Sequence, residues 1–301
     1  MNFAVMYHYV REQNGWSGIS PLTPDAFERQ IDAILDSHQI VSVEKLRNRS
    51  LEPKAVITFD DGTKDQYRFA FEILQRKGVQ AYFAVMSGPR ITGEIPLVHL
   101  IHTVLSFISD EQLWGIISDA YSIDDLTNKS AIYHYEANLF RRYNKYVLNF
   151  LLNEQEARRI LEPIFKDIFP DNPAFIDEYY LSDSEIIEMH NAGMTIGVHC
   201  HKHTPYYGNA LHYFENEILP CKEYLERLGI TPRWYTPPFG GGNLHKEMQK
   251  ELTPILMEAG FTGGFLTTPG VIDDTYNFWI SRLDCNKLVN LDVQSVLKSY
   301  L

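Results

Sequence analysis

Two short segments far apart in the chain carry side chains that together could form a hydrolytic metal centre. Residues Thr58–Gly62 read Thr-Phe-Asp-Asp-Gly and place adjacent carboxylates at the end of a mostly apolar run. Residues His199–His203 read His-Cys-His-Lys-His and place two imidazoles four residues apart after another apolar run. One aspartate and two histidines are a common ligand set for a divalent metal that keeps positions open for water and substrate. The second aspartate could then act as a general base on that water.

The acidic pair also has an interpretation that involves no chemistry. An Asp-Gly step is typical of a turn in which the glycine takes left-handed angles, and Asp61-Gly62 alone would indicate little more. Two adjacent carboxylates directly after an apolar strand are harder to explain in this way, because burying like charges side by side is unfavourable without a cation. Since α/β folds place active sites at the carboxyl ends of strands, we expect Asp60 and Asp61 to be functional.

The histidine cluster follows the apolar run Ile196–Val198. A single histidine is usually a structural residue, whereas three within five residues favour a metal site. A spacing of four brings the rings of His199 and His203 together if the backbone turns helically between them. His201 lies between these two and is expected to point elsewhere. Cys200 is expected to pack beside the site or to support a ligand.

The bulk composition narrows the range of partners. The chain has 301 residues, of which 45% are hydrophobic and 22% charged, as in an ordinary globular protein. Its formal net charge of −12 argues against nucleic acid and against anionic membrane surfaces, which both require a basic surface. No uninterrupted apolar run approaches the length of a membrane span, so no membrane insertion is expected. The sequence leaves the oligomeric state open.

Cysteine usage and the amino terminus bear on the compartment. The three cysteines, Cys200, Cys221 and Cys285, cannot all pair within one chain, so we predict reduced thiols. The first residues, Met1–His8, lack the basic region and long apolar stretch of a signal peptide. The sequence therefore predicts a cytoplasmic location.

Short β-type runs alternate with amphipathic helices, which predicts an α/β fold with parallel strands. Thr23-Pro24 and the capping box of Ser182 and Glu185 mark helix starts. Residues 94–180 break the rhythm with helical patterning, so we predict a mainly helical insertion or lid between the α/β segments 1–93 and 181–301. Strands are predicted at residues 3–6, 40–43, 55–59, 81–86, 195–198, 261–266 and 278–283, and further helices at 213–228 and 246–259.

At its two motifs the chain resembles the polysaccharide deacetylases, the NodB-like carbohydrate esterases of family 4. Thr58–Gly62 resembles the first signature of that family and His199–His203 resembles the second. Pro237–Gly240, which reads Pro-Pro-Phe-Gly, is similar to the third. The resemblance covers residues 1–91 and 180–283. It implies a distorted (β/α) barrel of the NodB type that carries the helical insertion.

The resemblance also implies a role for each matching residue. Asp60 corresponds to the catalytic base, and the metal ligands correspond to Asp61, His199 and His203. A mixed set of nitrogen and oxygen donors suits Zn²⁺, with Co²⁺, Ni²⁺ or Fe²⁺ also possible. The residues expected to contact substrate are Pro238, Phe239, Gly240 and Tyr206.

The third signature departs from the family pattern at one position. Thr236 stands where the family usually has an arginine that pairs with the catalytic aspartate. Arg233 lies three residues away, and Arg282 follows the predicted strand at 278–281. We favour Arg282 as the replacement catalytic partner of Asp60, because the end of a strand can direct a side chain into a barrel mouth. The alternative is a surface or structural salt bridge.

A second departure concerns the general acid, because the Leu-x-His signature that usually supplies it is absent. The segment Met6–Tyr9 resembles the amino-terminal Tyr-His segment of poly-N-acetylglucosamine deacetylases, a branch in which this acid comes from the start of the chain. His8 is therefore the expected catalytic acid. The alternative is a histidine that caps a loop at the sheet edge.

The function favoured by these residues is metal-dependent hydrolysis of an N-acyl group, foremost N-acetyl, on an amino sugar or glycan precursor. Two alternatives remain at this point. The first is a deformylase or another hydrolase of non-peptide C–N bonds with the same fold. The second is a non-catalytic carbohydrate-binding protein with a relic site, which the missing family arginine favours.

Overall fold

The structure is a computed structural model that describes residues 1–46, 48, 50–118, 123–272 and 277–300. The chain divides into two compact units. The first comprises Met1–Glu12, Pro21–Glu94 and Ile176–Leu301, and the second comprises Gln13–Ser20 and Ile95–Phe175. Every candidate site residue lies in the first unit.

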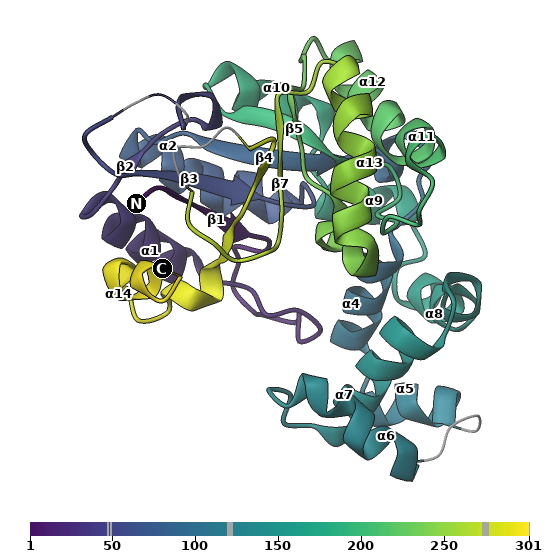
Figure 1. The fold of residues 1–301 in the computed structure, drawn as a ribbon. Coiled ribbons are helices and arrows are strands. Elements are labelled where there is room, and N and C mark those ends of the chain that lie inside the picture. Colours follow the sequence, from purple (N-terminus) through teal and green to yellow (C-terminus); the bar gives the residue numbers. More distant parts are fainter. Residues whose placement is uncertain (47, 49, 119–122, 273–276, 301) are drawn as a thin grey trace. The chain divides into compact units, whose positions relative to one another are not determined.

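A single sheet of parallel strands organises the first unit (Figure 1). Its order is β8-β7-β6-β5-β4-β3-β1-β9, and β2 pairs separately with β3. The strands are β1 Phe3–Tyr7, β2 Gln39–Ile40, β3 Lys54–Phe59, β4 Ala81–Met86, β5 Thr195–Cys200, β6 Trp234–Tyr235, β7 Gly263–Phe265, β8 Trp279–Ile280 and β9 Leu283–Asp284. The α/β class with parallel strands is confirmed. Strand β6 was not expected from the sequence, because two residues are too few for a periodic signal.

The two outer strands of the sheet belong to one stretch of chain. Strand β8 pairs with β7, and β9 pairs with β1. Only Ser281 and Arg282 separate them, so a single segment reaches both ends of the strand order. The sheet therefore curls into a distorted (β/α) barrel, as expected, and Arg282 sits at the break between its outer strands.

Alternate strand residues face two different cores. One set, including Ala4, Val56 and Tyr82, forms an inner cluster with Trp234 and Phe265. The intervening residues pack against the surrounding helices and include Phe3, Val5, Ile57, Phe59 and Phe83. This period of two is the pattern of strands that are covered on both faces.

Close packing inside the barrel fixes one glycine. A Cβ atom on Gly197 would lie 2.3 Å from the ring of Tyr82. Tyr82 is buried and fills this space, with its hydroxyl 3.0 Å from Thr236 Oγ1. Glycine at this position of β5 leaves room for the aromatic ring beneath the polar end of the strand.

Two helices of the first unit begin where the sequence signals place them. Thr23 caps α1, and Ser182 and Glu185 form the capping box of α10. The predicted helix at 213–228 begins earlier, at Ala210, and passes through a π-helical turn. The elements are η1 Val43–Lys45, α1 Pro24–Leu35, η2 Gln66–Phe71, α2 Glu72–Lys77, α3 Gly88–Ile91, α10 Asp183–Asn191, α11 Ala210–Tyr213, η6 Phe214–Ile218, α12 Leu219–Arg227, η7 Pro238–Leu244, α13 His245–Glu258, η8 Cys285–Leu288 and α14 Val293–Lys298.

The second unit is mainly helical and has its own small core. Trp114, Ile117, Leu126, Tyr143 and Val147 pack together within it. Its helices are α4 Leu97–Phe107, α5 Asp110–Ile117, α6 Ile123–Lys129, η4 Ser130–Tyr133, α7 Leu139–Tyr146, η5 Val147–Leu151 and α8 Glu154–Ile168. The next helix, α9 Asn172–Tyr179, contains the boundary with the first unit, which resumes at Ile176. The role of this unit as a lid stays a prediction.

Segment 13–20 of the amino-terminal part joins this second unit, which the sequence did not indicate. The reason is hydrogen bonding: Gly18 N donates to Ser106 Oγ, and Arg141 donates to the carbonyl of Ser17. Within the described ranges, no helix combines the length and the apolar character that crossing a bilayer requires.

Candidate functional site

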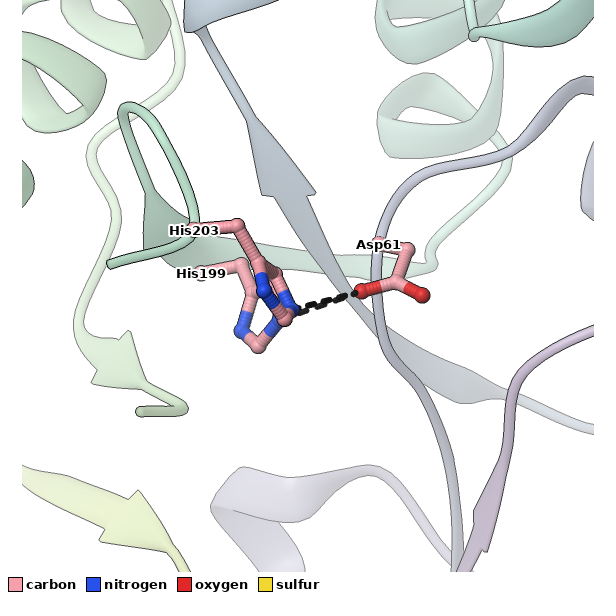
Figure 2. A group of neighbouring side chains, drawn as sticks. All are labelled: Asp61, His199 and His203. Carbon is pink, nitrogen blue, oxygen red and sulfur yellow. Dashed lines mark ion pairs between the residues drawn. The ribbon is translucent and has the colours of Figure 1, made fainter. Parts of the chain in front are cut away.

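Asp61, His199 and His203 meet at the carboxyl edge of the sheet. Strands β3 and β5 flank β4 on either side, so the residues that follow them lie near one another. Asp61 Oδ1 lies 3.2 Å from His199 Nε2 and 3.4 Å from His203 Nε2. Figure 2 shows both rings turned toward the same carboxylate oxygen. The two distant segments therefore converge on one point.

This donor set fits a divalent cation. The three candidate ligand atoms lie within 4.8 Å of one another. Ligands about 2.1 Å from one ion, at neighbouring coordination positions, lie about 3.0 to 3.4 Å apart, which matches the two measured separations. His199 Nδ1 donates to the carbonyl of Thr236 at 2.6 Å, so Nε2 is the nitrogen that keeps its lone pair for a metal. Asp61, His199 and His203 would hold the ion.

The backbone brings His203 into place by a route that the sequence analysis did not anticipate. A helical turn would bring the two rings together, but the segment after β5 is not helical, and His203 has a φ of 66°. Asp61 is also in the left-handed region, with a φ of 76°. Such angles are uncommon for residues other than glycine and occur where the surrounding structure enforces them.

His201 points away from the cluster, as expected. Its Nδ1 lies 2.9 Å from Ser87 Oγ. Cys200, between His199 and His201 in the sequence, is buried, and burial raises the pKa of its thiol well above the ordinary value. Neither side chain offers a further metal ligand.

Arg282 makes a bidentate ion pair with Asp60. Its two terminal nitrogens donate to Asp60 Oδ1 and Oδ2 at 2.7 and 2.8 Å. The guanidinium also donates to Thr58 Oγ1 and to the carbonyl of Leu266, and the residue is only 1% exposed. Arg233, the other arginine considered, is exposed on the segment before β6. The structure thus brings Arg282, and not Arg233, to the expected base.

The electrostatic environment keeps Asp60 ionised. Burial would raise its pKa, but the charge and hydrogen bonds of Arg282, with smaller contributions from His199 and His8, outweigh burial and hold the pKa below its ordinary value. In His199, burial lowers the pKa, but the hydrogen bond to Asp61 and both carboxylates raise it by more. A cation at this point would replace that attraction with coordination.

His8 lies at the rim of the same site. Its Nε2 is 3.9 Å from Asp60 Oδ2, and its side chain is 42% exposed. The loop that carries it is tied down by two residues of the chain after Asp61. Gln66 Nε2 donates to the carbonyls of His8 and Asp60, and Asp65 Oδ2 accepts from Val10 N at 2.6 Å.

The segment with the third signature presents one aromatic ring. Phe239 is 54% exposed, and its ring lies edge-on to that of His203, with 4.8 Å between centroids. Its φ of 52° and that of Gly240, 63°, turn the chain so that this ring is displayed. A Cβ on Gly240 would fall 2.0 Å from Thr267 Oγ1, so glycine is required there. Pro238 and Gly240 themselves are buried.

Tyr206, which we expected to contact substrate, is buried, its ring packs against Tyr213, and its hydroxyl donates to Glu251. Its apolar surface belongs to the core between the barrel and its helices. A contact between Tyr206 and substrate stays a prediction.

Three supporting residues were missed by the sequence analysis: Gln66, Asp65 and Glu217. Each is a single polar residue on a helix and belongs to no motif. For Glu217, the signal in the sequence was its position: it is four residues from both Tyr213 and Cys221, which are buried on the same face of the helix. A polar residue on an otherwise apolar stripe indicates a buried hydrogen-bonding role.

The fold and the site together define a parallel (β/α) barrel with an Asp-His-His cluster beside an Asp-Arg pair. Residues 47–262 match the polysaccharide deacetylase family, and the chain belongs to that family. Family membership supports N-deacetylation of a carbohydrate as its activity. A search of curated proteins finds none that matches this chain significantly.

Solved structures share the fold at low sequence identity. The deacetylase PplD of Streptococcus pyogenes, in complex with acetate, has 15% identity and a TM-score of 0.59, with 98% of this chain and 97% of that chain covered. IcaB from Ammonifex degensii has 14% identity and a TM-score of 0.58, with 98% and 96% covered. The de-N-acetylase from Aggregatibacter actinomycetemcomitans has 15% identity and a TM-score of 0.56, with 100% and 99% covered. These likenesses bear out a NodB-type barrel.

Proposed function

We propose that this protein is a metal-dependent hydrolase that removes the N-acetyl group from an amino sugar. The observation that carries the proposal is the convergence of two independent constellations at one edge of the sheet. Asp61, His199 and His203 form a ligand set, and Asp60 with Arg282 forms an ionised carboxylate next to it. Family membership supplies the carbohydrate as the substrate class.

The cation expected is Zn²⁺, with Co²⁺, Ni²⁺ or Fe²⁺ compatible with the same donors. When bound, it supplies Lewis acidity toward the amide carbonyl and lowers the pKa of water. His199 contributes Nε2 because its Nδ1 is committed to the carbonyl of Thr236. Asp61 contributes the negative charge that offsets part of the dication.

Asp60 is the proposed general base. It accepts a proton from the attacking water while the water oxygen adds to the carbonyl carbon of the N-acetyl group. Arg282 holds both carboxylate oxygens, which keeps Asp60 in the basic form and fixes its orientation. The burial of the pair places this base in a region of low dielectric, where its orientation is maintained without solvent reorganisation.

His8 is the proposed general acid. In its protonated form it donates a proton to the sugar nitrogen as the C–N bond breaks, so that a neutral amine leaves and acetate remains. Its exposure lets solvent restore the proton after each turnover. Its Nε2 lies within 4 Å of the carboxylate of Asp60, so acid and base reach the same reacting group.

Phe239 is the proposed sugar platform. Its exposed ring stands beside His203 and is held there by the backbone of the glycine segment that follows. Aromatic faces stack on the apolar faces of sugar rings, and the ring therefore orients the N-acetyl group toward the cluster.

The test is release of acetate from N-acetylglucosamine and its short oligomers by purified protein. Activity is expected after loading with Zn²⁺ or Co²⁺, and loss is expected after chelation. Asp60→Asn should abolish release, whereas the control Asp36→Asn, at an exposed position after α1, should leave it unchanged. Full activity of Asp60→Asn would refute the assigned base, and a metal-loaded protein without activity on any N-acetylated sugar would favour the relic.

A further inference from the structure

The ligand loop, residues 199–204, has to turn two imidazoles toward one point within five residues. It leaves β5 at Cys200 and passes through the left-handed angle of His203. Backbone of this kind gathers successive N–H groups on one side and forms a concavity that binds anions. An acceptor on the side of these N–H groups would therefore stabilise the loop.

Glu217 supplies that anion from within the protein. Its carboxylate is buried, with the residue 3% exposed, and Oε2 accepts from Lys202 N at 2.8 Å. Backbone N–H groups of His201 and Thr204 and the Thr204 hydroxyl also bond to it. Burial raises the pKa of Glu217, and these hydrogen bonds oppose the rise. The hydrogen bonds described for this carboxylate thus come from the loop itself.

The carbonyl side of the loop is fixed by other elements. Gly88 N, at the start of α3, donates to the carbonyl of His201 at 2.9 Å. The Tyr213 hydroxyl donates to the carbonyl of Thr204 at 2.9 Å. Hydrogen bonds thus hold both the N–H side and the carbonyl side of the loop.

We propose that Glu217 is a positioning residue that presets the ligand loop for the metal. The inference rests on the metal site of the proposed function. A loop that is ordered by folding does not have to lose its backbone freedom again when the ion binds, so more of the coordination energy appears as affinity. Outer-shell residues of this kind change metal affinity although they do not touch the metal.

The experiment measures Co²⁺ affinity of the full chain after removal of metal, with the visible absorption of bound Co²⁺ as the signal. In Glu217→Gln the side-chain NH₂ faces backbone N–H groups, so at least one hydrogen bond is lost. We expect affinity to fall by about tenfold to a hundredfold. The control is Glu215→Gln, on the same turn but exposed, which should bind as tightly as wild type. No activity measurement enters this test.

Thermal unfolding of each metal-free variant separates positioning from a loss of folding. If Glu217→Gln does not fold, Thr204→Val decides, because it removes only the hydroxyl that bonds to the carboxylate. This variant is expected to lose about threefold to tenfold in Co²⁺ affinity. Wild-type affinity in whichever of these variants folds would overturn the inference. A wild-type protein that binds no Co²⁺ would overturn the metal site, and the inference with it.

Discussion

The ion pair of Asp60 and Arg282 offers the sharpest test of how the site is built. Replacing Arg282 by methionine keeps much of the side-chain volume but leaves the Asp60 carboxylate buried without its partner. It also removes donors to Thr58 Oγ1 and to the carbonyl of Leu266. Removing one member of a buried pair lowers stability by about 3–5 kcal/mol, because the remaining charge is uncompensated. We expect a loss of this size in the free energy of unfolding.

The assay is urea unfolding of metal-free protein at pH 7, followed by the fluorescence of tryptophan, since Trp234 lies in the inner cluster of the barrel. The control is Arg76→Met, which removes an arginine from an exposed ion pair with Glu28. Exposed pairs contribute little, so this variant should unfold close to wild type. The difference between the two variants isolates the effect of burial.

The pH dependence should change sign in Arg282→Met. In wild type the pair lowers the folded-state pKa of Asp60, so its stabilisation is present above the unfolded-state pKa of about 3.9 and is lost as pH falls through the lower, folded value. Without Arg282, burial, the largest influence, outweighs the smaller effects of His199 and His8 and raises the pKa of Asp60. The deficit of the variant should then be largest near neutral pH and should shrink as the pH falls toward 4.

A second substitution tests whether the unpaired charge of Asp60 causes the loss of stability. Adding Asp60→Asn to Arg282→Met removes the unpaired charge, so the double variant should recover much of the lost stability. A loss below about 1 kcal/mol in Arg282→Met, or a double variant no more stable than the single one, would refute the reasoning.

Three further predictions concern the residues around His8. His8→Ala should lower kcat by about a hundredfold or more, and wild-type kcat in a steady-state assay would exclude His8 as the acid. Gln66→Leu removes the hydrogen bonds to the carbonyls of His8 and Asp60 and should lower kcat about tenfold to a hundredfold with little change in KM. An unchanged kcat would show that catalysis does not require these two hydrogen bonds. Burial raises the pKa of Asp65 to about 6, so its ionisation should lower stability progressively as pH rises from about 4 to 6, by about 3 kcal/mol in all. Asp65→Asn should flatten that part of the stability profile in urea titrations, and an unaltered slope would contradict the assignment.

Most of the fold and the central residues of the site could be predicted from the sequence. Helix starts at Thr23 and Ser182 were readable because capping depends on local residue types. The convergence of Asp61 with His199 and His203 was predictable because parallel strands bring their carboxyl ends to one edge. Arg282 could be proposed as the partner of Asp60 from its place at a strand end, although only coordinates show the pair.

The features that could not be predicted from the sequence depend on tertiary structure. Strand β6 is two residues long, so its existence follows from pairing with β5 and β7. Segment 13–20 joined the second unit through isolated hydrogen bonds that no sequence pattern reveals. The burial of Tyr206 could not be predicted, because proximity in sequence to the histidines does not set the direction of a side chain. Glu217 and Gln66 act on backbone groups of distant residues, and such partners have no signature in a single sequence.

The central claim is that Asp61, His199 and His203 share one ion, and anomalous X-ray scattering from Zn²⁺-loaded crystals tests it most directly. The account predicts one strong anomalous peak about 2.0–2.2 Å from Asp61 Oδ1 and from Nε2 of both histidines, and its loss in crystals of Asp61→Asn. A peak elsewhere with nothing between these three residues, or a peak that persists unchanged in the variant, would contradict the account.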